Sequence, residues 1–258
     1  MPRFAANLTM MFADRPMTER FAAAKAAGFA AVEMLFPYDM EPETVADLLR
    51  RNSLHLVLFN ICQGDFAGGE RGLACLPGRT EDFRAALLHG EHYVEVLRPD
   101  CVHVMAGLLP ANVSREEAER VYVDNVRLAA RTLARHHTAI CLEAISGVSM
   151  PGFFLSCQEQ TARCLDLIDE SNVGMQFDCF HCQMAEGNVA GKLRAYLPRI
   201  RHIQIAGAPE RHEPDTGELR YEYLFSLLDE FGYPGYVGCE YNPAGRTEDG
   251  LDWYARWK

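Results

Sequence analysis

Short runs of β-branched and other apolar residues alternate along the chain with longer segments whose apolar residues recur at helical spacing. We expect strands at the short runs, which are residues 4–8, 31–35, 56–60, 101–105, 139–143, 173–178, 200–205 and 236–241. Each connection between them is long enough to hold a crossover helix. The pattern therefore predicts parallel strands joined by helices.

The longer segments carry signals for where helices begin and end. Pro16 and Gly28 bound one such segment, and the sequence S-x-x-E at Ser114 and again at Ser156 matches a capping box. Thr80 opens another segment, with acidic residues in its first turn. We expect further helices at residues 80–97, 221–231 and 247–257.

Strict alternation of strands and helices predicts a parallel sheet, and eight repeats predict that it closes into a (β/α)₈ TIM barrel. The alternative is an open, doubly wound sheet. A G-x-G-x-x-G turn does not follow the first strand, and no change in composition divides the chain. We therefore expect one barrel domain over residues 1–258.

Composition places the chain among ordinary globular proteins. Hydrophobic residues make up 48% and charged residues 24% of the 258 positions, which excludes a disordered chain, a collagen-like fibre and a disulfide scaffold. No apolar run has the length of a membrane span, and the first residues lack the pattern of a signal peptide. We expect a cytoplasmic protein. The net charge of −11 disfavours nucleic acid as a partner, and the oligomeric state, a homo-oligomer included, stays open.

The nine cysteines are an odd number, and several lie inside apolar runs where a thiol acts as a small hydrophobe. Cys179 and Cys182 form a C-x-x-C motif, which is typical of redox or zinc chemistry. A second pair at zinc-ribbon spacing is missing, and the motif follows a strand without opening an obvious thioredoxin-type helix. We interpret these cysteines as structural.

Two connections are longer than usual, at residues 60–78 and 146–154, and both are rich in glycine. They follow the third and fifth predicted strands, at the end where barrel enzymes place their active sites. A lid or a substrate-gripping loop is one interpretation. A loop without function is the other.

Four successive predicted strands, from the fifth to the eighth, finish in a side chain that carries oxygen. These residues are Glu143, Asp178, Gln204 and Glu240. Each alternates with an apolar neighbour, so if the neighbours face the helices, all four side chains point into the mouth of the barrel.

Three carboxylates meeting in a partly dry site repel one another strongly, so protons or a cation must balance their charge. Three carboxylates and one amide oxygen suit a divalent ion such as Mg²⁺ or Mn²⁺. The alternative is that each acid only caps a strand or the next helix. Three acids and one amide in register at successive strand ends favour the metal site.

Two histidines lie near the same end. His181 follows Asp178 by three residues, and His103 alternates with two valines of the fourth predicted strand, so that it faces inward. Each is a candidate to bind substrate oxygen or to support the metal, with a purely structural role as the alternative.

Several stretches resemble the hydroxypyruvate isomerase family of xylose isomerase-like barrels, and the likeness runs along nearly the whole chain. They are RFAANL at residues 3–8, GERGLACLPGR at 69–79, QIA at 204–206 and GCEY at 238–241. The stretches HVMAG at 103–107 and QIAG at 204–207, with RHEP at 211–214, are more similar to the 2-oxo-tetronate isomerase branch.

The resemblance implies an isomerase of small oxo sugar acids that converts 2-oxo-tetronate to 3-oxo-tetronate through a cis-enediolate. It implies metal ligands at Glu143, Asp178, Gln204 and Glu240, of which Glu143 and Glu240 also transfer the proton. Arg71 and Arg211 follow strand ends and are candidates to grip the substrate carboxylate, with solvated surface arginines as the alternative.

Other activities compete with this one. Hydroxypyruvate isomerase differs by one hydroxymethylene of the substrate, and a ketose 3-epimerase would use the same acids on a neutral sugar. An abasic-site endonuclease would need a histidine-rich zinc cluster and a basic face, which the charge disfavours. A sugar-acid binding protein without catalysis is the most distant alternative.

Overall fold

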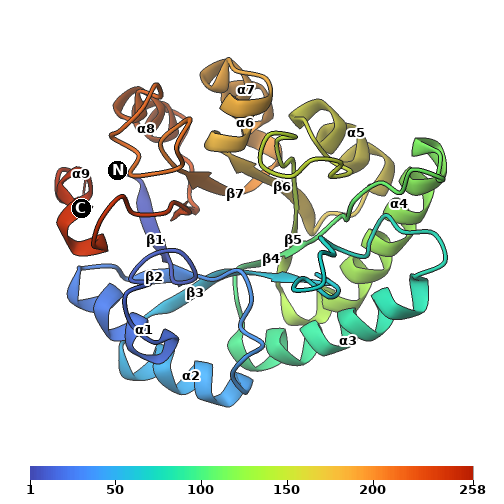
Figure 1. Ribbon diagram of the computed structural model, residues 1–258, viewed down its shortest axis with the longest axis horizontal. Helices are drawn as coiled ribbons and strands as arrows, with labels where there is room; N and C mark the ends of the chain where they lie inside the picture. The colour runs from blue at the N-terminus through green and yellow to red at the C-terminus, as the bar shows by residue number, and fades with distance from the viewer. Residues whose placement is uncertain (258) are drawn as a thin grey trace.

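A closed parallel barrel is the centre of the molecule (Figure 1). The computed structural model describes residues 1–257, and within them eight strands pair in chain order, with β8 returning to β1. The strands are β1 Arg3–Asn7, β2 Ala31–Glu33, β3 His55–Ile61, β4 Cys101–Val104, β5 Ala139–Glu143, β6 Val173–Asp178, β7 Ile200–Ile205 and β8 Tyr236–Cys239. The predicted TIM barrel is confirmed, and closure through β1 and β8 excludes the open sheet.

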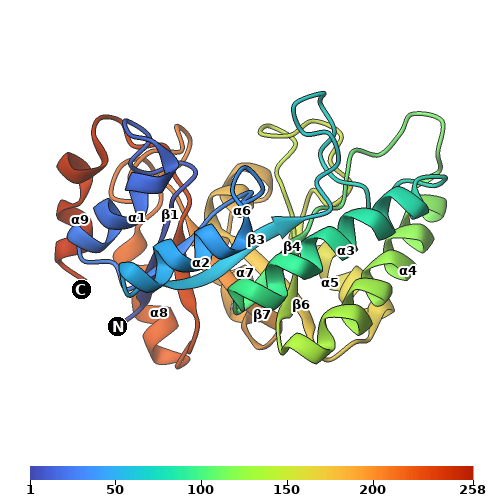
Figure 2. The same cartoon turned by 90° about the horizontal axis from the view of Figure 1, so that it is seen from below.

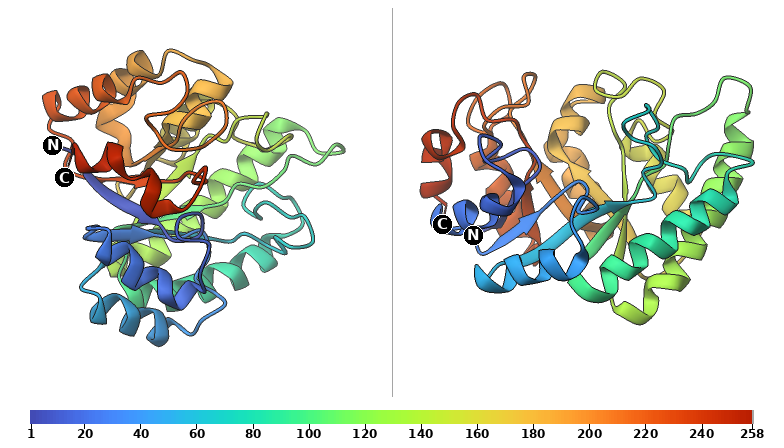
Figure 3. Two further views of the ribbon diagram at one scale, coloured as in Figure 1. Left: turned by 60° about the vertical axis from the view of Figure 1, so that its left-hand side comes forward. Right: turned by 60° about the horizontal axis from the view of Figure 1, so that its bottom comes forward.

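Helices surround the barrel and connect its strands. They are α1 Met17–Ala26, α2 Pro42–Arg51, α3 Thr80–Leu97, α4 Arg115–Leu133, α5 Gln158–Ile168, α6 Cys179–Ala185, α7 Val189–Tyr196, α8 Tyr221–Glu230 and α9 Asp252–Ala255. The single helix expected at residues 247–257 is wrong. A 3₁₀ helix, Thr247–Gly250, precedes the short α9 instead. In both views of Figure 3 the two chain ends lie close together.

One of the two predicted capping serines caps its helix. The Ser114 side chain accepts a hydrogen bond from the Glu117 backbone at the start of α4. At α5 the prediction is wrong, because Ser156 lies outside the cap and bonds Gln160 instead. The first amide of α5 donates to the carboxylate of Glu186, 28 residues away, at 2.9 Å.

The C-x-x-C motif does open a helix, contrary to the sequence interpretation. α6 begins at Cys179, and Asp178 caps it by accepting hydrogen bonds from the Phe180 and His181 backbone amides. Cys179 and Cys182 are buried and form no disulfide. Burial raises the pKa of both thiols. Both features fit the structural role assigned to these cysteines.

The alternation along the strands separates two cores. Leu142, Phe177 and Ile203 pack in a large cluster that includes residues of the helices. A second cluster contains strand residues only, among them Cys101 and Cys141, and fills the inside of the barrel. The predicted outward and inward faces are therefore correct. The polar residues of the inward face, such as Glu143 and Asp178, lie at the carboxyl ends of the strands, beyond this apolar cluster.

The long loops rise together on one side of the molecule. Figure 2 shows the segments after β3, β4 and β5 in teal, green and yellow-green at the top. Isolated β-bridges join Gly72 to Ala106 and Leu108 to Phe153, so the three loops are tied to one another by backbone contacts. Within residues 1–257, no helix is both long and apolar enough to cross a membrane.

Candidate active site

Three buried carboxylates gather where the last strands end. Glu143 is the last residue of β5, Asp178 is the last residue of β6, and Glu240 directly follows β8. Their exposed fractions are 5%, 1% and 5%. The predicted convergence of these acids at the barrel mouth is observed, since Arg211 contacts two of them and electrostatic coupling joins all three.

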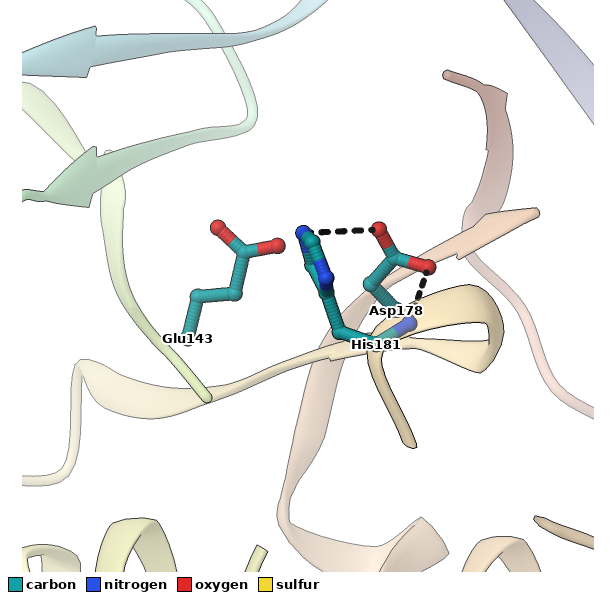
Figure 4. Close-up of side chains that lie close together, drawn as sticks. All are labelled: Glu143, Asp178 and His181. Atoms are coloured by element: carbon teal, nitrogen blue, oxygen red, sulfur yellow. Dashed lines mark hydrogen bonds and ion pairs between the residues drawn. The ribbon is translucent and has the colours of Figure 1, made fainter. Parts of the chain in front are cut away.

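His181 brings the acids into a compact group. One potential ligand atom from each of Glu143, Asp178 and His181 lies within 4.8 Å of the others. Figure 4 shows the three side chains close together, with the His181 ring between the two carboxylates. His181 Nε2 lies 3.7 Å from Asp178 Oδ2, and its Nδ1 lies 3.4 Å from the Ser146 hydroxyl. This buried triad has the residue types and the spacing to hold a metal ion.

The surroundings of the two glutamates disfavour their charged forms. Burial, and then the nearby charges of Glu240 and Asp178, raise the pKa of Glu143 well above its usual range. Burial also raises the pKa of Glu240 to about 8, although the Arg211 guanidinium opposes the shift. The site therefore calls for positive charge beyond what Arg211 supplies.

The two histidines are held neutral by the same lack of water. Burial lowers the pKa of His181 to about 4 and that of His103 to about 3. Neutral imidazole is the form that ligates metals or hydrogen-bonds a substrate. His103 Nδ1 lies 3.4 Å from Glu143 Oε2, so both predicted histidines do reach the acids.

Arg211 supplies the positive charge present in the cluster. Its Nη2 lies 2.5 Å from Glu240 Oε2 and 3.4 Å from Asp178 Oδ2, and its guanidinium packs over the Phe180 ring. Its backbone is left-handed at φ 60°, where an ordinary side chain is strained. Strain at such a residue, together with its contacts, points to a functional position.

Arg71 lies in the loop after β3 and bonds the backbone of that loop. Its Nη1 donates to the backbone oxygens of Phe66 and Glu70, at 3.0 and 2.7 Å, and its guanidinium stacks on the Phe66 ring. Phe66 lines the cavity beside the acids, whereas Arg71 is not among the described residues that line it. Arg71 therefore reaches the site through Phe66.

Gln204 lies inside the barrel with both ends of its amide in hydrogen bonds. Its Nε2 donates to Glu33 Oε1 at 3.0 Å, and its Oε1 accepts from Gln176 Nε2 at 2.7 Å. The oxygen is thus turned toward β6, the strand that carries Asp178. A carbonyl oxygen has a second lone pair, so this bond leaves a ligand position on it.

Glu33, which was not among the predicted site residues, is fully buried at the end of β2. Its carboxylate accepts from Asn7 Nδ2 at 3.0 Å, pairs with His202 Nε2 at 2.7 Å and holds the Gln204 amide. A Cβ on Gly238 would lie 2.2 Å from Glu33 Oε2, so a larger residue there would displace this carboxylate. The same strand-end rule that identified Glu143 would have found Glu33 on the second strand.

A cavity of about 170 Å³ opens beside the acids. Its polar lining includes Glu143, Glu240, His181 and Arg211, and its apolar wall includes Phe36, Phe66, Met105 and Met150. Asn60, at the end of β3, also lines it and is a second residue that the sequence analysis missed. The arrangement can neutralise, orient and exchange protons with a small anionic molecule.

Comparison with known proteins shows a consistent likeness over the whole chain. A sequence profile of the family described as xylose isomerase-like TIM barrel matches residues 21–257. The chain is 47% identical over 253 residues to a 2-oxo-tetronate isomerase of Cupriavidus necator, covering 98% of this chain and 97% of that protein. It is 38% identical over 253 residues to the hydroxypyruvate isomerase of Escherichia coli, with 98% of both chains covered.

The three-dimensional likeness is equally extensive. A crystal structure described as an AP endonuclease, family 2, from Brucella melitensis superposes with a TM-score of 0.98. It is 42% identical in sequence, and the match covers 100% of both chains.

Proposed function

The chain belongs to the family of xylose isomerase-like TIM barrels, and from this premise we propose that it converts 2-oxo-tetronate to 3-oxo-tetronate. It is an isomerase of the 2-oxo-tetronate or hydroxypyruvate type, in agreement with the resemblance seen in the sequence. One observation carries the proposal: the buried carboxylates of Glu143, Asp178 and Glu240 gather beside a cavity of the size of a small molecule.

The carboxylates fit a divalent ion. Glu143 Oε1 is buried with no hydrogen-bond partner among the described residues, and burial raises the pKa of both glutamates. Glu143, Asp178, Glu240 and the Gln204 oxygen would hold the ion, and this set of oxygens suits Mg²⁺ or Mn²⁺. When bound, the ion would act as a Lewis acid that stabilises negative charge on the substrate oxygens.

The glutamates would move the proton. A carboxylate takes the proton from C3 of 2-oxo-tetronate, and the electrons of that C–H bond form the cis-enediolate across C2 and C3. A carboxyl group then returns a proton to C2, while the proton of the C3 hydroxyl passes to the oxygen on C2. The carbonyl has moved by one carbon and no atom is lost. We assign this exchange to Glu143 and Glu240, which both line the cavity.

The substrate carboxylate needs a cation of its own. Arg211 lines the cavity, and a guanidinium binds a carboxylate through two parallel hydrogen bonds. We assign this grip to Arg211 and the support of the cavity wall to Arg71. His181 and His103 complete the polar lining as hydrogen-bonding groups for substrate oxygen.

Hydroxypyruvate is the second candidate substrate, because the Escherichia coli relative at 38% identity carries that name. The description as an AP endonuclease applies to the Brucella melitensis protein, and we do not extend it to this chain. Carboxylates dominate the present site, and a net charge of −11 opposes a DNA backbone.

Isotope exchange tests the proposal. The protein is incubated with Mg²⁺ or Mn²⁺ and each oxo acid in deuterated water, and the products are followed by NMR. We expect deuterium at the carbon that receives the proton and a carbonyl shifted by one position. An epimerase would invert a centre without shifting the carbonyl, and a binding protein would give neither change. Either of those results, or turnover without solvent deuterium, contradicts the proposal.

A further inference from the structure

Two adjacent polar side chains in the cavity have unused hydrogen-bonding atoms. Asn60 on β3 and His103 on β4 pair in register, so they stand side by side on the inner face of the barrel. Both are buried, with exposed fractions of 5% and 1%, and both line the cavity. Asn60 Oδ1 and both ring nitrogens of His103 have no hydrogen-bond partner among the described residues.

A buried polar atom without a partner is costly, and native proteins rarely keep one without a reason. Here such atoms occur on two neighbouring strands and at the same cavity. The Asn60 backbone oxygen, in contrast, is satisfied by the Tyr38 hydroxyl at 2.9 Å. Buried side-chain atoms without a partner also occur away from the cavity, on Tyr122, Gln158, Gln176 and His202. Asn60 and His103 differ from these because they are paired neighbours that both line the cavity, where a ligand can reach them.

The location of the pair fixes which part of a ligand it meets. In a closed ring of strands, β3 and β4 lie across from β7 and β8, and Arg211 and Glu240 follow those opposite strands. A substrate whose carboxylate lies at Arg211, and whose reacting carbons lie beside Glu143 and Glu240, therefore extends its far end toward Asn60 and His103.

The chemistry of the pair matches a hydroxyl group. An amide and an imidazole both donate and accept hydrogen bonds, and so does a hydroxyl, whereas a carboxylate only accepts. A second anionic group here would also face Glu143, whose Oε2 lies 3.4 Å from His103 Nδ1. A neutral hydroxyl meets no such repulsion.

We propose that Asn60 and His103 form a subsite for the terminal C4 hydroxyl of the substrate and select the four-carbon acid over hydroxypyruvate. This inference rests on the proposed function and deepens it. In 2-oxo-tetronate, C2 and C3 react and the C4 hydroxyl remains for recognition. In hydroxypyruvate the only hydroxyl belongs to the reacting pair, so the subsite stays unfilled and its buried polar atoms stay unpaired.

The substitution Asn60→Leu tests the subsite, because leucine keeps the shape and removes the hydrogen bonds. We measure kcat/KM for 2-oxo-tetronate and for hydroxypyruvate. We expect the ratio of the two to fall by about 10-fold or more, with hydroxypyruvate nearly unaffected. Met105→Leu, in the same cavity wall, is the matched control and changes both values together. An equal loss on both acids, or no loss on either, overturns the subsite.

Binding of unreactive acids gives a readout that does not depend on turnover. Calorimetry with erythronate, threonate and glycerate compares four-carbon with three-carbon acids on the same protein. In Asn60→Leu we expect the four-carbon acids to lose their advantage over glycerate. If the wild-type protein turns over neither oxo acid, the proposed function fails, and the affinity ratio still decides the subsite. A wild-type protein that binds glycerate as tightly as both four-carbon acids overturns it.

Discussion

Glu240 combines a solvent-poor position with direct contact to a guanidinium, and it is the residue on which the proton exchange depends. Glu240→Gln keeps the shape and one oxygen but removes the group that accepts a proton. We expect turnover to fall by about 10² or more, the usual size of a general acid–base contribution. The fold and much of the Mn²⁺ affinity should persist, as measured by circular dichroism and electron paramagnetic resonance.

Asp178→Asn is the comparison for Glu240→Gln. Asp178 caps α6 and contacts His181, so its loss should weaken Mn²⁺ binding more than Glu240→Gln does. Near-normal turnover of Glu240→Gln with Mn²⁺ bound would remove Glu240 from the proton exchange.

Substitutions of Arg71 and Arg211 should raise KM by different amounts. Arg71 contacts the loop backbone and the Phe66 ring, so Arg71→Ala loosens the cavity wall. We expect a several-fold higher KM for the oxo acid and an unchanged Mn²⁺ affinity. Arg211→Lys removes the bidentate fork from the site and should raise KM by about 10-fold or more. Unchanged kinetics in Arg71→Ala would show that the loop needs no such support.

For single residues, the sequence could identify Glu143, Asp178 and Glu240, because inward-facing side chains at strand ends follow from alternation alone. It could not show that Arg211 lies against Asp178 and Glu240, since that contact depends on the path of the loop after β7. Glu33 and Asn60 obey the same alternation on earlier strands. Each stands on a strand whose neighbours in the chain do not repeat the pattern of successive acidic strand ends, so alternation alone did not mark them as site residues.

The loops after β3 and β4 are joined at a point where only glycine fits. A Cβ on Gly72 would lie 2.4 Å from the Met105 oxygen, and its φ of 126° is strained for other residues. Gly72→Ala should therefore lower the free energy of unfolding by more than the roughly 1–3 kcal/mol of backbone strain alone, as measured by urea denaturation.

Gly69→Ala separates the cost of backbone strain from the cost of the steric clash. Gly69 also has a positive φ, of 101°, but an added Cβ would meet nothing within 4 Å. Its loss of stability should reflect strain alone and be the smaller of the two. Equal losses for both variants would show that the contact between the loops has room for a side chain.

Helix starts show what local sequence can and cannot specify. The cap of α4 is local, because Ser114 and Glu117 are three residues apart, and the motif predicted it. The cap of α5 is the carboxylate of Glu186, which reaches the first amide of the helix from the segment after α6. No motif within α5 encodes that contact, so Ser156 was assigned a role that tertiary structure gives to another residue.

Closure of the barrel creates contacts that no single element contains. Glu33 on β2 meets Asn7 on β1 and His202 on β7, although 169 residues separate it from the histidine. It also fills the space left by Gly238 on β8. The order and type of the elements could be predicted from periodicity, but the partner of a buried carboxylate across the ring depends on strand register and tilt.

The buried acids at the barrel mouth should make the stability of the whole molecule depend on pH and on bound metal. The pKa of Glu240 rises from 4.5 in the unfolded chain to about 8 in the folded protein. The folded state then binds the proton more tightly, so its contribution to stability is full below pH 4.5 and is lost as the pH rises through 8. His103 and His181, whose pKa values fall from 6.5, act in the opposite direction below pH 6.5.

Between pH 6.5 and 8, comparison with Glu240→Gln therefore isolates the Glu240 carboxyl, because groups such as His55, whose pKa is raised by Asp100, are common to both proteins. In chelator, the free energy of unfolding should fall by about 1–2 kcal/mol relative to Glu240→Gln over this range, as measured by urea denaturation. Mn²⁺ binds more tightly when these acids are ionised, so one fixed Mn²⁺ concentration should stabilise the fold more at pH 8 than at pH 6.5. At a concentration of 100 times the Kd for that pH, the stabilisation should be about 2.7 kcal/mol. Equal stabilisation by Mn²⁺ at both pH values would mean that the ion binds away from these carboxylates, because only ionised acids in its coordination shell couple its affinity to their protons.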